Sequence, residues 1–147
     1  SLEVIQALVN SYPESIKDTE HIGFIPLHGA CWGAASLEVI TFLIESYPVS
    51  VKITDRYENL PLHVACWKNA SLEVIQALVN SYPESIKDTE HIGFIPLHGA
   101  CWGAASLEVI TFLIESYPVS VKITDRYENL PLHVACWKNA SLEVIQA

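Results

Sequence analysis

Four histidine–cysteine pairs contain the residues of this sequence that are best suited to do chemistry. In each pair the cysteine follows the histidine by three residues, so both side chains would lie on one face of a helix. The pairs are His28 and Cys31, His63 and Cys66, His98 and Cys101, and His133 and Cys136. A zinc site needs about four ligands that converge on one point, whereas these pairs are spread along the chain at intervals of 35 residues. We therefore expect no catalytic residue, no metal site and no cofactor, and hence no enzyme.

A repeat positions these pairs. The run Ile25-Pro26-Leu27-His28-Gly29-Ala30-Cys31-Trp32 returns in closely similar form from Leu60, Ile95 and Leu130. Residues 1–35 and 36–70 agree at 19 of 35 positions, whereas residues 1–77 and 71–147 are identical. The chain is therefore expected to form one array of units 1–35, 36–70, 71–105 and 106–140 with a partial unit 141–147, and with a sequence period of 70 residues.

Each unit is expected to contain two helices. Apolar residues at positions 2, 4, 5, 8, 9 and 12 have helical spacing; a serine such as Ser36 precedes the helix as its N-cap, and Pro13 ends it. Residues 14–25 are expected to be extended, with a turn near Gly23. In the alternate unit Asn59 is the residue that best tolerates a left-handed turn conformation. Pro26 then opens a second helix of about two turns.

A short helix opened by Pro-Leu-His, a tight turn and a longer helix resemble the ankyrin repeat. The resemblance is carried by Pro26-Leu27-His28-x-Ala30 and Leu37-Glu38-Val39-Ile40, and it covers all 147 residues. The unit is longer than the family norm of about 33 residues. An isoleucine or leucine also replaces the usual threonine before the proline, so the hydroxyl N-cap of the short helix is absent. The resemblance implies an all-α fold, an ankyrin-like α-solenoid of stacked helix-turn-helix repeats.

The same resemblance implies structural roles for the histidines and cysteines. In ankyrin repeats the equivalent histidine bonds the backbone of the neighbouring loop, and the cysteine position is a buried alanine. Stacked helices lie about 8–10 Å apart, beyond the ~7 Å limit between the Cα atoms of a disulfide. We therefore expect free cysteines that pack as small buried hydrophobes.

The resemblance places partner binding on the concave face, which the loop tips and the exposed side of the short helices form. In the first kind of unit the matching positions are His21, Ile22, Phe24 and Trp32, repeated as His91, Ile92, Phe94 and Trp102. In the second kind they are Arg56, Tyr57, Asn59, Trp67 and Lys68, repeated as Arg126, Tyr127, Asn129, Trp137 and Lys138. The tryptophans occur in every unit and could equally fill the crevice between repeats. Isoleucine and phenylalanine alternate with polar residues, so the stack itself does not require them, and they indicate a partner-contact surface.

Asn69 and Asn139 each begin an Asn-Ala-Ser sequence that matches the N-glycosylation pattern. The alternative interpretation is structural, because asparagine suits a turn after a helix and serine suits the N-cap of the next. The family resemblance implies a cytoplasmic protein, whereas glycosylation would indicate an extracellular fibre.

Composition excludes two classes of partner. The net charge is −9, from 17 acidic and 8 basic residues, so no basic stripe is available for nucleic acid. Polar residues or proline interrupt every apolar run before the ~20 residues that a membrane-spanning helix needs, and no membrane insertion is expected.

Two hypotheses for function follow. The terminal units carry the same apolar sequence as the interior ones, which indicates a window of a longer array that self-associates or forms a filament. Alternatively, the chain is a protein-binding module of a larger protein, or a repeat scaffold, that uses its concave aromatic face.

Overall fold

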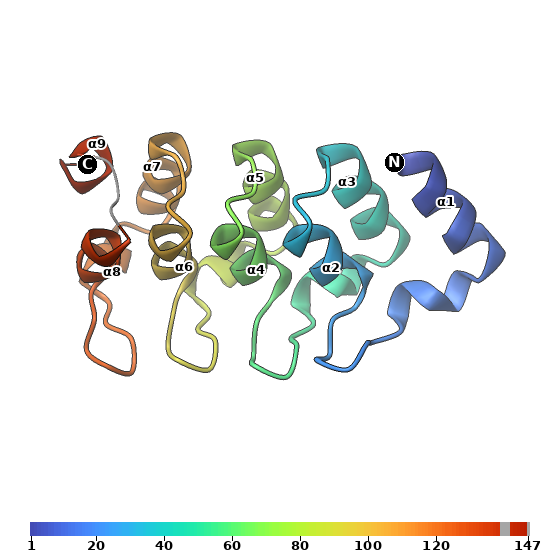
Figure 1. Cartoon of the computed structure of the whole chain (residues 1–147), viewed down its shortest axis with the longest axis horizontal. Helices are drawn as coiled ribbons and strands as arrows, with labels where there is room; N and C mark the ends of the chain where they lie inside the picture. Colours follow the sequence, from blue (N-terminus) through green and yellow to red (C-terminus); the bar gives the residue numbers. More distant parts are fainter. Residues whose placement is uncertain (139–141, 147) are drawn as a thin grey trace.

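The computed structural model describes residues 1–138 and 142–146, and all regular structure in these ranges is helical. Figure 1 shows two rows of helices that advance side by side from the N-terminus to the C-terminus. One row contains the longer helices: α1 (Leu2–Ser11), α3 (Leu37–Ser46), α5 (Leu72–Ser81) and α7 (Leu107–Ser116), with α9 (Leu142–Gln146) at the end. The other row contains the short helices: α2 (Pro26–Trp32), α4 (Pro61–Trp67), α6 (Pro96–Trp102) and α8 (Pro131–Trp137). The expected all-α solenoid is therefore confirmed.

The longer helices begin at a serine, as expected. The Oγ atom of Ser36 accepts a hydrogen bond from the backbone N–H of Val39 at 3.4 Å, and Ser71 and Ser106 cap α5 and α7 in the same way. The glutamate two residues after each serine lies in the first turn, where the helix dipole favours a carboxylate. Each of these helices ends before a Tyr-Pro pair, because proline disfavours helical geometry at the residue before it.

The prediction that residues 14–25 are extended is wrong for the first residues of this segment. Residues Pro13–Lys17 form a 3₁₀ helix, η1, and the corresponding segments form η2 (Pro48–Lys52), η3 (Pro83–Lys87) and η4 (Pro118–Lys122). Proline ends the preceding α-helix, but its fixed φ is also suited to the first position of a new helical turn. In η1 the Oγ atom of Ser15 donates a hydrogen bond to the carbonyl oxygen of Tyr12 at 2.6 Å, which closes this turn.

The turn at Gly23 is confirmed. The φ angle of this residue is +86°, in the left-handed region that glycine adopts readily because it lacks a Cβ atom. In the alternate unit the left-handed residue is Glu58, with a φ of 65°, and not Asn59. Asn59 is instead held by Asp55: Oδ1 of Asp55 accepts the backbone N–H of Asn59 at 2.9 Å, and Oδ2 accepts its side-chain N–H at 3.1 Å. The buried carboxylate therefore determines the shape of this loop.

Neighbouring repeats are joined by a ladder of loop hydrogen bonds. The backbone N–H of Arg56 donates to the carbonyl oxygen of Ile22 at 3.1 Å, and that of His91 donates to Tyr57 at 3.0 Å. The core lies between the two rows of helices, and each helix pair, such as α2 with α3, spans a boundary of the 35-residue sequence units. The described helices include none long and apolar enough to cross a membrane.

The first long helix has a different environment from its interior copies. Leu8 in α1 is 61% exposed, whereas Leu78, at the identical position of α5, is 2% exposed. The reason is that α5 packs on the short helix α4 and between α3 and α7, while no described short helix precedes α1 and its one longer neighbour is α3. A hollow of about 850 Å³ between α1, α2 and α3 has the same origin.

Candidate functional site

The buried histidines, His28, His63 and His98, connect adjacent repeats. In His28 the Nδ1 atom accepts the backbone N–H of Ile25 at 3.2 Å, so Nε2 carries the proton and donates it to the carbonyl oxygen of Asn59 at 3.0 Å. His63 and His98 make the same two kinds of bond, with Nε2 at 2.8 Å and 3.0 Å from the carbonyls of Asp88 and Asn129. The histidine thus caps the short helix in place of the absent threonine.

Burial lowers the pKa of each of these histidines below its usual value, although the hydrogen bonds to the carbonyl oxygens oppose this effect. They are therefore neutral at pH 7, and both ring nitrogens are engaged. In residues 1–138 and 142–146, no group of three or more His, Cys, Asp or Glu side chains is arranged to hold a metal ion.

The cysteines are free, and Cys31, Cys66 and Cys101 are buried whereas Cys136 is exposed. Burial raises the pKa of Cys31 and Cys101 to about 12, and it raises that of Cys66 as well. The buried thiols therefore stay protonated and are poor nucleophiles. These three cysteines have the packing role expected from the sequence, whereas for Cys136 the expected burial is wrong, because no described short helix follows α8 to cover it.

The interfaces between short helices alternate in their aromatic packing. Between α2 and α4, the ring centroids of Trp32 and Trp67 lie 5.4 Å apart, and the Nζ atom of Lys68 lies 4.2 Å from the centroid of the Trp32 ring. Between α6 and α8, Lys138 lies over Trp102 at 4.3 Å in the same way. The lysine of the second kind of unit therefore covers the tryptophan of the first kind.

The α4/α6 interface is different because Gly103 follows α6 at the position where a lysine, Lys68 or Lys138, follows α4 and α8. A Cβ atom at Gly103 would lie 2.4 Å from the carbonyl oxygen of Trp67, so glycine permits this close approach of the end of α6 to α4. No basic side chain covers Trp67 in the part of the chain that the structure describes. Trp67 and Trp102 make no ring contact there and flank a pocket instead.

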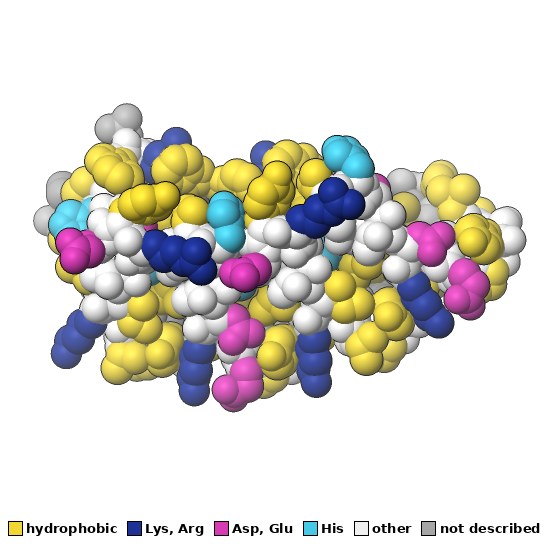
Figure 2. Space-filling model, turned by 90° about the horizontal axis from the view of Figure 1, so that it is seen from below, with side chains coloured by type: hydrophobic (Ala, Val, Ile, Leu, Met, Phe, Trp, Pro, Cys, Tyr) yellow, Lys and Arg dark blue, Asp and Glu magenta, His cyan; other side chains and the backbone are white. Residues whose placement is uncertain are grey.

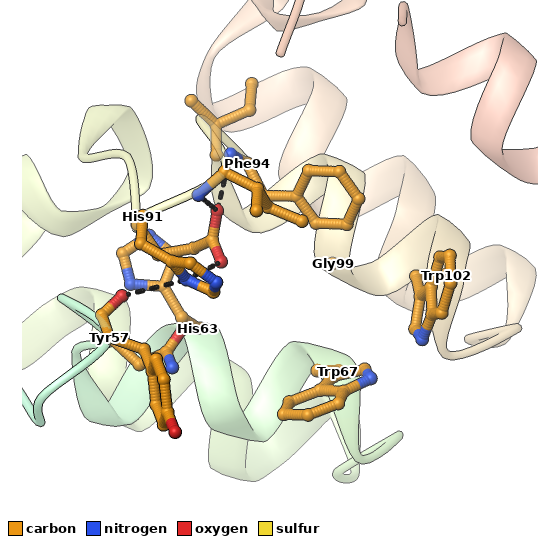
Figure 3. A pocket seen from close by; sticks show the side chains of 11 residues that line it. Tyr57, His63, Trp67, His91, Phe94, Gly99 and Trp102 are labelled. Atoms are coloured by element: carbon orange, nitrogen blue, oxygen red, sulfur yellow. Dashed lines mark hydrogen bonds and ion pairs between the residues drawn. The ribbon is translucent and has the colours of Figure 1, made fainter. Parts of the chain in front are cut away.

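This pocket, which we call the α4/α6 pocket, has a volume of about 340 Å³. Figure 3 shows Tyr57, Trp67, Phe94 and Trp102 around its open centre, with His91 at one side. Two loop tips and two short helices form its walls, so it exists only where two consecutive repeats stack. Its lining residues are Tyr57, Asn59, His63, Trp67, Glu90, His91, Ile92, Phe94, Ile95, Gly99 and Trp102.

Glu90 is the acidic residue of the pocket. Its Oε1 atom accepts the backbone N–H groups of Ile92 and Phe94 at 2.9 and 2.8 Å. Its Oε2 atom lies 3.1 Å from Nδ1 of His91, which is also 3.2 Å from the carbonyl oxygen of Tyr57. Because both partners of Nδ1 are acceptors, this atom carries a proton (dashed lines in Figure 3).

The environment of Glu90 differs from that of Glu20, which occurs in an identical sequence. The side chain of Glu90 is 8% exposed and that of Glu20 is 45% exposed. Burial raises the pKa of Glu90 even though the N–H groups of Phe94 and Ile92 and the neighbouring His91 favour its charged form. Burial also acts to raise the pKa of Glu20. There the hydrogen bonds from the backbone N–H groups of Phe24 and Ile22, together with the charges of His21 and Arg56, outweigh burial and lower the pKa. Stacking on the preceding loop causes this difference.

The structure brings seven of the predicted contact residues into the pocket: Tyr57, Asn59, Trp67, His91, Ile92, Phe94 and Trp102. Asn59 is buried rather than exposed, because Asp55 holds its side chain. Sequence reasoning missed Glu90, His63, Ile95 and Gly99. The signal for Glu90 was that the two kinds of unit both carry an acidic residue at this position of the loop, with Asp55 as its equivalent.

The remaining predicted residues lie along the same face outside the pocket. Phe24 contacts Trp32, with ring centroids 5.9 Å apart, and Lys68 and Lys138 cover tryptophans as described above. The others are His21, Ile22, Arg56, Arg126, Tyr127, Asn129 and Trp137, of which Ile22 and Asn129 are half-buried and the rest are exposed. Seen from the loop side, hydrophobic side chains gather along one edge of the molecule with basic and histidine side chains among them (Figure 2).

Of the two possible glycosylation sites, the structure describes Asn69 alone. Asn69 is exposed in the turn after α4 and has a left-handed φ of 59°, as expected for an asparagine after a helix. Its glycosylation stays a prediction. Asn139 lies outside the described residues.

Comparison with known proteins identifies the type of repeat. A family model described as ankyrin repeats (3 copies) matches residues 62–147, which extend from α4 to the end of the chain. A search of curated proteins gives no match.

Proposed function

The chain belongs to the ankyrin repeat family, and we propose that it is a non-enzymatic binding module whose partner protein docks at the α4/α6 pocket. Ankyrin repeats are protein-interaction modules. What we add is the place of binding, and the observation that carries it is an aromatic pocket built by two consecutive repeats.

The chemistry of the pocket supports this proposal. Aromatic side chains are enriched at the centres of protein interfaces, where they bury a large area at small cost in conformational entropy. The rings of Tyr57, Trp67, Phe94 and Trp102 lie around one space that has the size of a small-molecule or side-chain site. An inserted side chain of a partner would contact several rings at once.

The alternation of the repeats gives a second argument. At the α2/α4 and α6/α8 interfaces the chain covers its own tryptophan with a lysine. At the α4/α6 interface no described lysine covers Trp67, and Trp67 and Trp102 do not touch as Trp32 and Trp67 do at the α2/α4 interface. The stack is therefore compatible with a closed surface, and of the three interfaces between described short helices the α4/α6 interface is the one that carries the open pocket.

The substitution Phe94→Ala tests the proposal, and Phe24→Ala, at the identical position of the first repeat, is its control. Both phenylalanines stack on a histidine, with centroids 5.2 Å apart in each case, and each contacts a tryptophan. The two substitutions should therefore cost similar stability, but Phe94 alone lines the pocket.

We would select binders from a displayed peptide library on the full chain and measure their affinities by fluorescence anisotropy. Phe94→Ala should weaken the selected peptides at least about tenfold, the effect of losing an interface hot spot, and Phe24→Ala should weaken them less than about threefold. Equal losses for the two variants, with unchanged circular dichroism, would exclude the pocket as the binding centre.

A second candidate function is self-association, and we propose it on the identity of residues 1–77 and 71–147. Because near-identical repeats stack on one another within the chain, the same surfaces are complementary between two copies, and a second copy stacked on α1 would bury Leu8. Sedimentation at increasing concentration should then show oligomers, electron microscopy should show filaments, and Leu8→Glu should abolish both. A monomer at high concentration would contradict this function and leave the binding proposal intact.

A further inference from the structure

We propose that the α4/α6 pocket binds a methylated ammonium group, presented by a methylated lysine side chain of the partner protein. This inference rests on the proposed function and names the chemistry that the same pocket recognises.

The chain already binds ammonium groups at the two sister interfaces. Lys68 places its Nζ atom 4.2 Å from the ring centroid of Trp32, and Lys138 places its Nζ atom 4.3 Å from that of Trp102. These distances are within the ~6 Å over which a cation is attracted by the negative face of an aromatic ring. The described side chains supply no such cation for Trp67. An external ammonium group at Trp67 would complete the pattern.

The rings around the pocket can hold such a group from several sides. Tyr57, Trp67, Phe94 and Trp102 surround the open centre in Figure 3. Cation–π attraction is strongest for tryptophan and increases when the site is desolvated. The volume of about 340 Å³ leaves room for the head group and for part of the side chain that carries it.

Glu90 supplies the complementary charge. Its side chain is 8% exposed, and His91 is the single basic side chain within ion-pair distance of it in the described ranges, with Nδ1 at 3.1 Å from Oε2. No lysine or arginine neutralises it there. Burial raises the pKa of Glu90, which means that its negative charge is incompletely compensated by the groups around it. A cation in the pocket would offset this cost, and the net charge of −9 favours the approach of a cationic partner.

The scarcity of acceptors on the walls selects for methylation. An unmodified lysine ammonium carries three N–H donors. In the pocket, Oε1 of Glu90 already accepts two backbone N–H groups and Oε2 lies against His91. Most N–H donors of an unmodified lysine would therefore lose their hydrogen bonds to water without replacement. A trimethylated ammonium has no donors, and its methyl groups pack against the rings.

The test uses small probes, so that it does not depend on the sequence of a partner. We would titrate the full chain with the acetyl-amide derivative of trimethyl-lysine, of unmodified lysine and of the neutral isostere in which carbon replaces the nitrogen. The readout is the NMR shift of the tryptophan indole N–H signals. We expect saturable binding of the trimethyl form at millimolar concentration or below, at least about tenfold tighter than binding of the other two.

Two matched variants locate the charge. Glu90→Gln retains an oxygen that can accept the N–H groups of Ile92 and Phe94, and it should weaken the trimethyl-lysine probe at least about fivefold. Glu20→Gln makes the same substitution in the same sequence outside the pocket and should leave affinity unchanged.

The outcomes are distinct. Equal affinity for the trimethyl form and its neutral isostere, or equal affinity of the two glutamine variants, would overturn the proposal. So would tighter binding of phosphocholine than of trimethyl-lysine, because it would assign the site to a lipid head group. If peptides bind in a Phe94-dependent way but trimethyl-lysine does not, the protein-binding function stands and the ammonium proposal fails. If neither binds, both fail.

Discussion

Gly103→Ala should destabilise the protein, whereas Gly33→Ala should not. The two glycines occur in identical sequences, and both have a negative φ, −78° for Gly103 and −84° for Gly33, so alanine is not strained by the backbone at either position. Their surroundings differ. A Cβ atom at Gly103 would lie 2.4 Å from the carbonyl oxygen of Trp67 and 3.0 Å from that of Cys66, whereas one at Gly33 would meet a single atom, the Gly29 oxygen, at 3.4 Å.

The size of the effect follows from these distances. An ordinary contact for such a carbon begins at 3.4 Å, so α6 must move away from α4 by about 1 Å to accommodate the methyl group. Forced overpacking of this kind costs about 1–3 kcal/mol, and a gap of 0.5–1 Å elsewhere in the interface loses about a quarter to a half of the dispersion energy there. Replacing glycine by alanine also restricts the unfolded chain and stabilises by about 0.4–1 kcal/mol. This second contribution cancels between the two variants because their local sequences are the same.

The assay is thermal and urea unfolding of both variants, followed by far-UV circular dichroism. Gly103→Ala should have a free energy of unfolding about 1–3 kcal/mol below that of Gly33→Ala, or a midpoint lower by about 2–12 °C at 2–4 °C per kcal/mol. Gly33→Ala should match or slightly exceed the wild type. Equal midpoints for the two variants would refute the reasoning, because they would mean that α4 and α6 do not approach as closely as described.

Three further predictions concern burial. Leu78→Ala should cost about 2–5 kcal/mol by creating a cavity, whereas Leu8→Ala, at the exposed copy of the same position, should cost less than about 1 kcal/mol; equal costs in urea unfolding would contradict the packing of α5. The three buried histidines have lowered pKa values, so the unfolded chain binds more protons than the folded chain at pH values below about 6.5. The free energy of unfolding should therefore be constant above this pH and decrease below it, by at most about 4 kcal/mol per pH unit; Glu90, with its raised pKa, opposes this by at most one proton. Urea unfolding at several pH values measures this dependence, and a free energy of unfolding that increased on acidification would contradict the prediction. Iodoacetamide should modify Cys136 and leave the buried thiols intact; mass spectrometry of the native protein should show one adduct, and more than one without loss of helical signal would contradict the burial.

The elements that local chemistry specifies were predictable from the sequence. Serine caps such as Ser36, the proline that opens α2 and the turn glycine Gly23 each act within four residues of their own position. The 3₁₀ helix after Pro13 was missed because proline both ends one helix and starts another turn, and the sequence pattern shows the first effect more clearly. The left-handed turn residue was assigned to Asn59 instead of Glu58, because the hydrogen bonds of the Asp55 carboxylate override the intrinsic preference of asparagine.

The candidate site was predictable as a face but not as a pocket. The alternation of phenylalanine with polar residues at a 70-residue period indicated which loop tips to consider. It could not show that Lys68 covers Trp32 while Trp67 stays open, because that depends on a glycine at position 103 that allows α6 to approach α4.

The sequence alone determined the repeat, the helices and the serine caps, because these follow from periodicity and from interactions close along the chain. The structural role of the histidines was implied by the resemblance to ankyrin repeats, since their Nε2 atoms bond carbonyl oxygens 25–31 residues away. It could not distinguish Glu20 from Glu90, Leu8 from Leu78 or Gly33 from Gly103, because residues 1–77 and 71–147 are identical. Only the tertiary structure separates the members of these pairs. Burial, pKa and steric contact at one repeat are set by the repeats stacked against it, and those neighbours lie some 35 residues away in the chain.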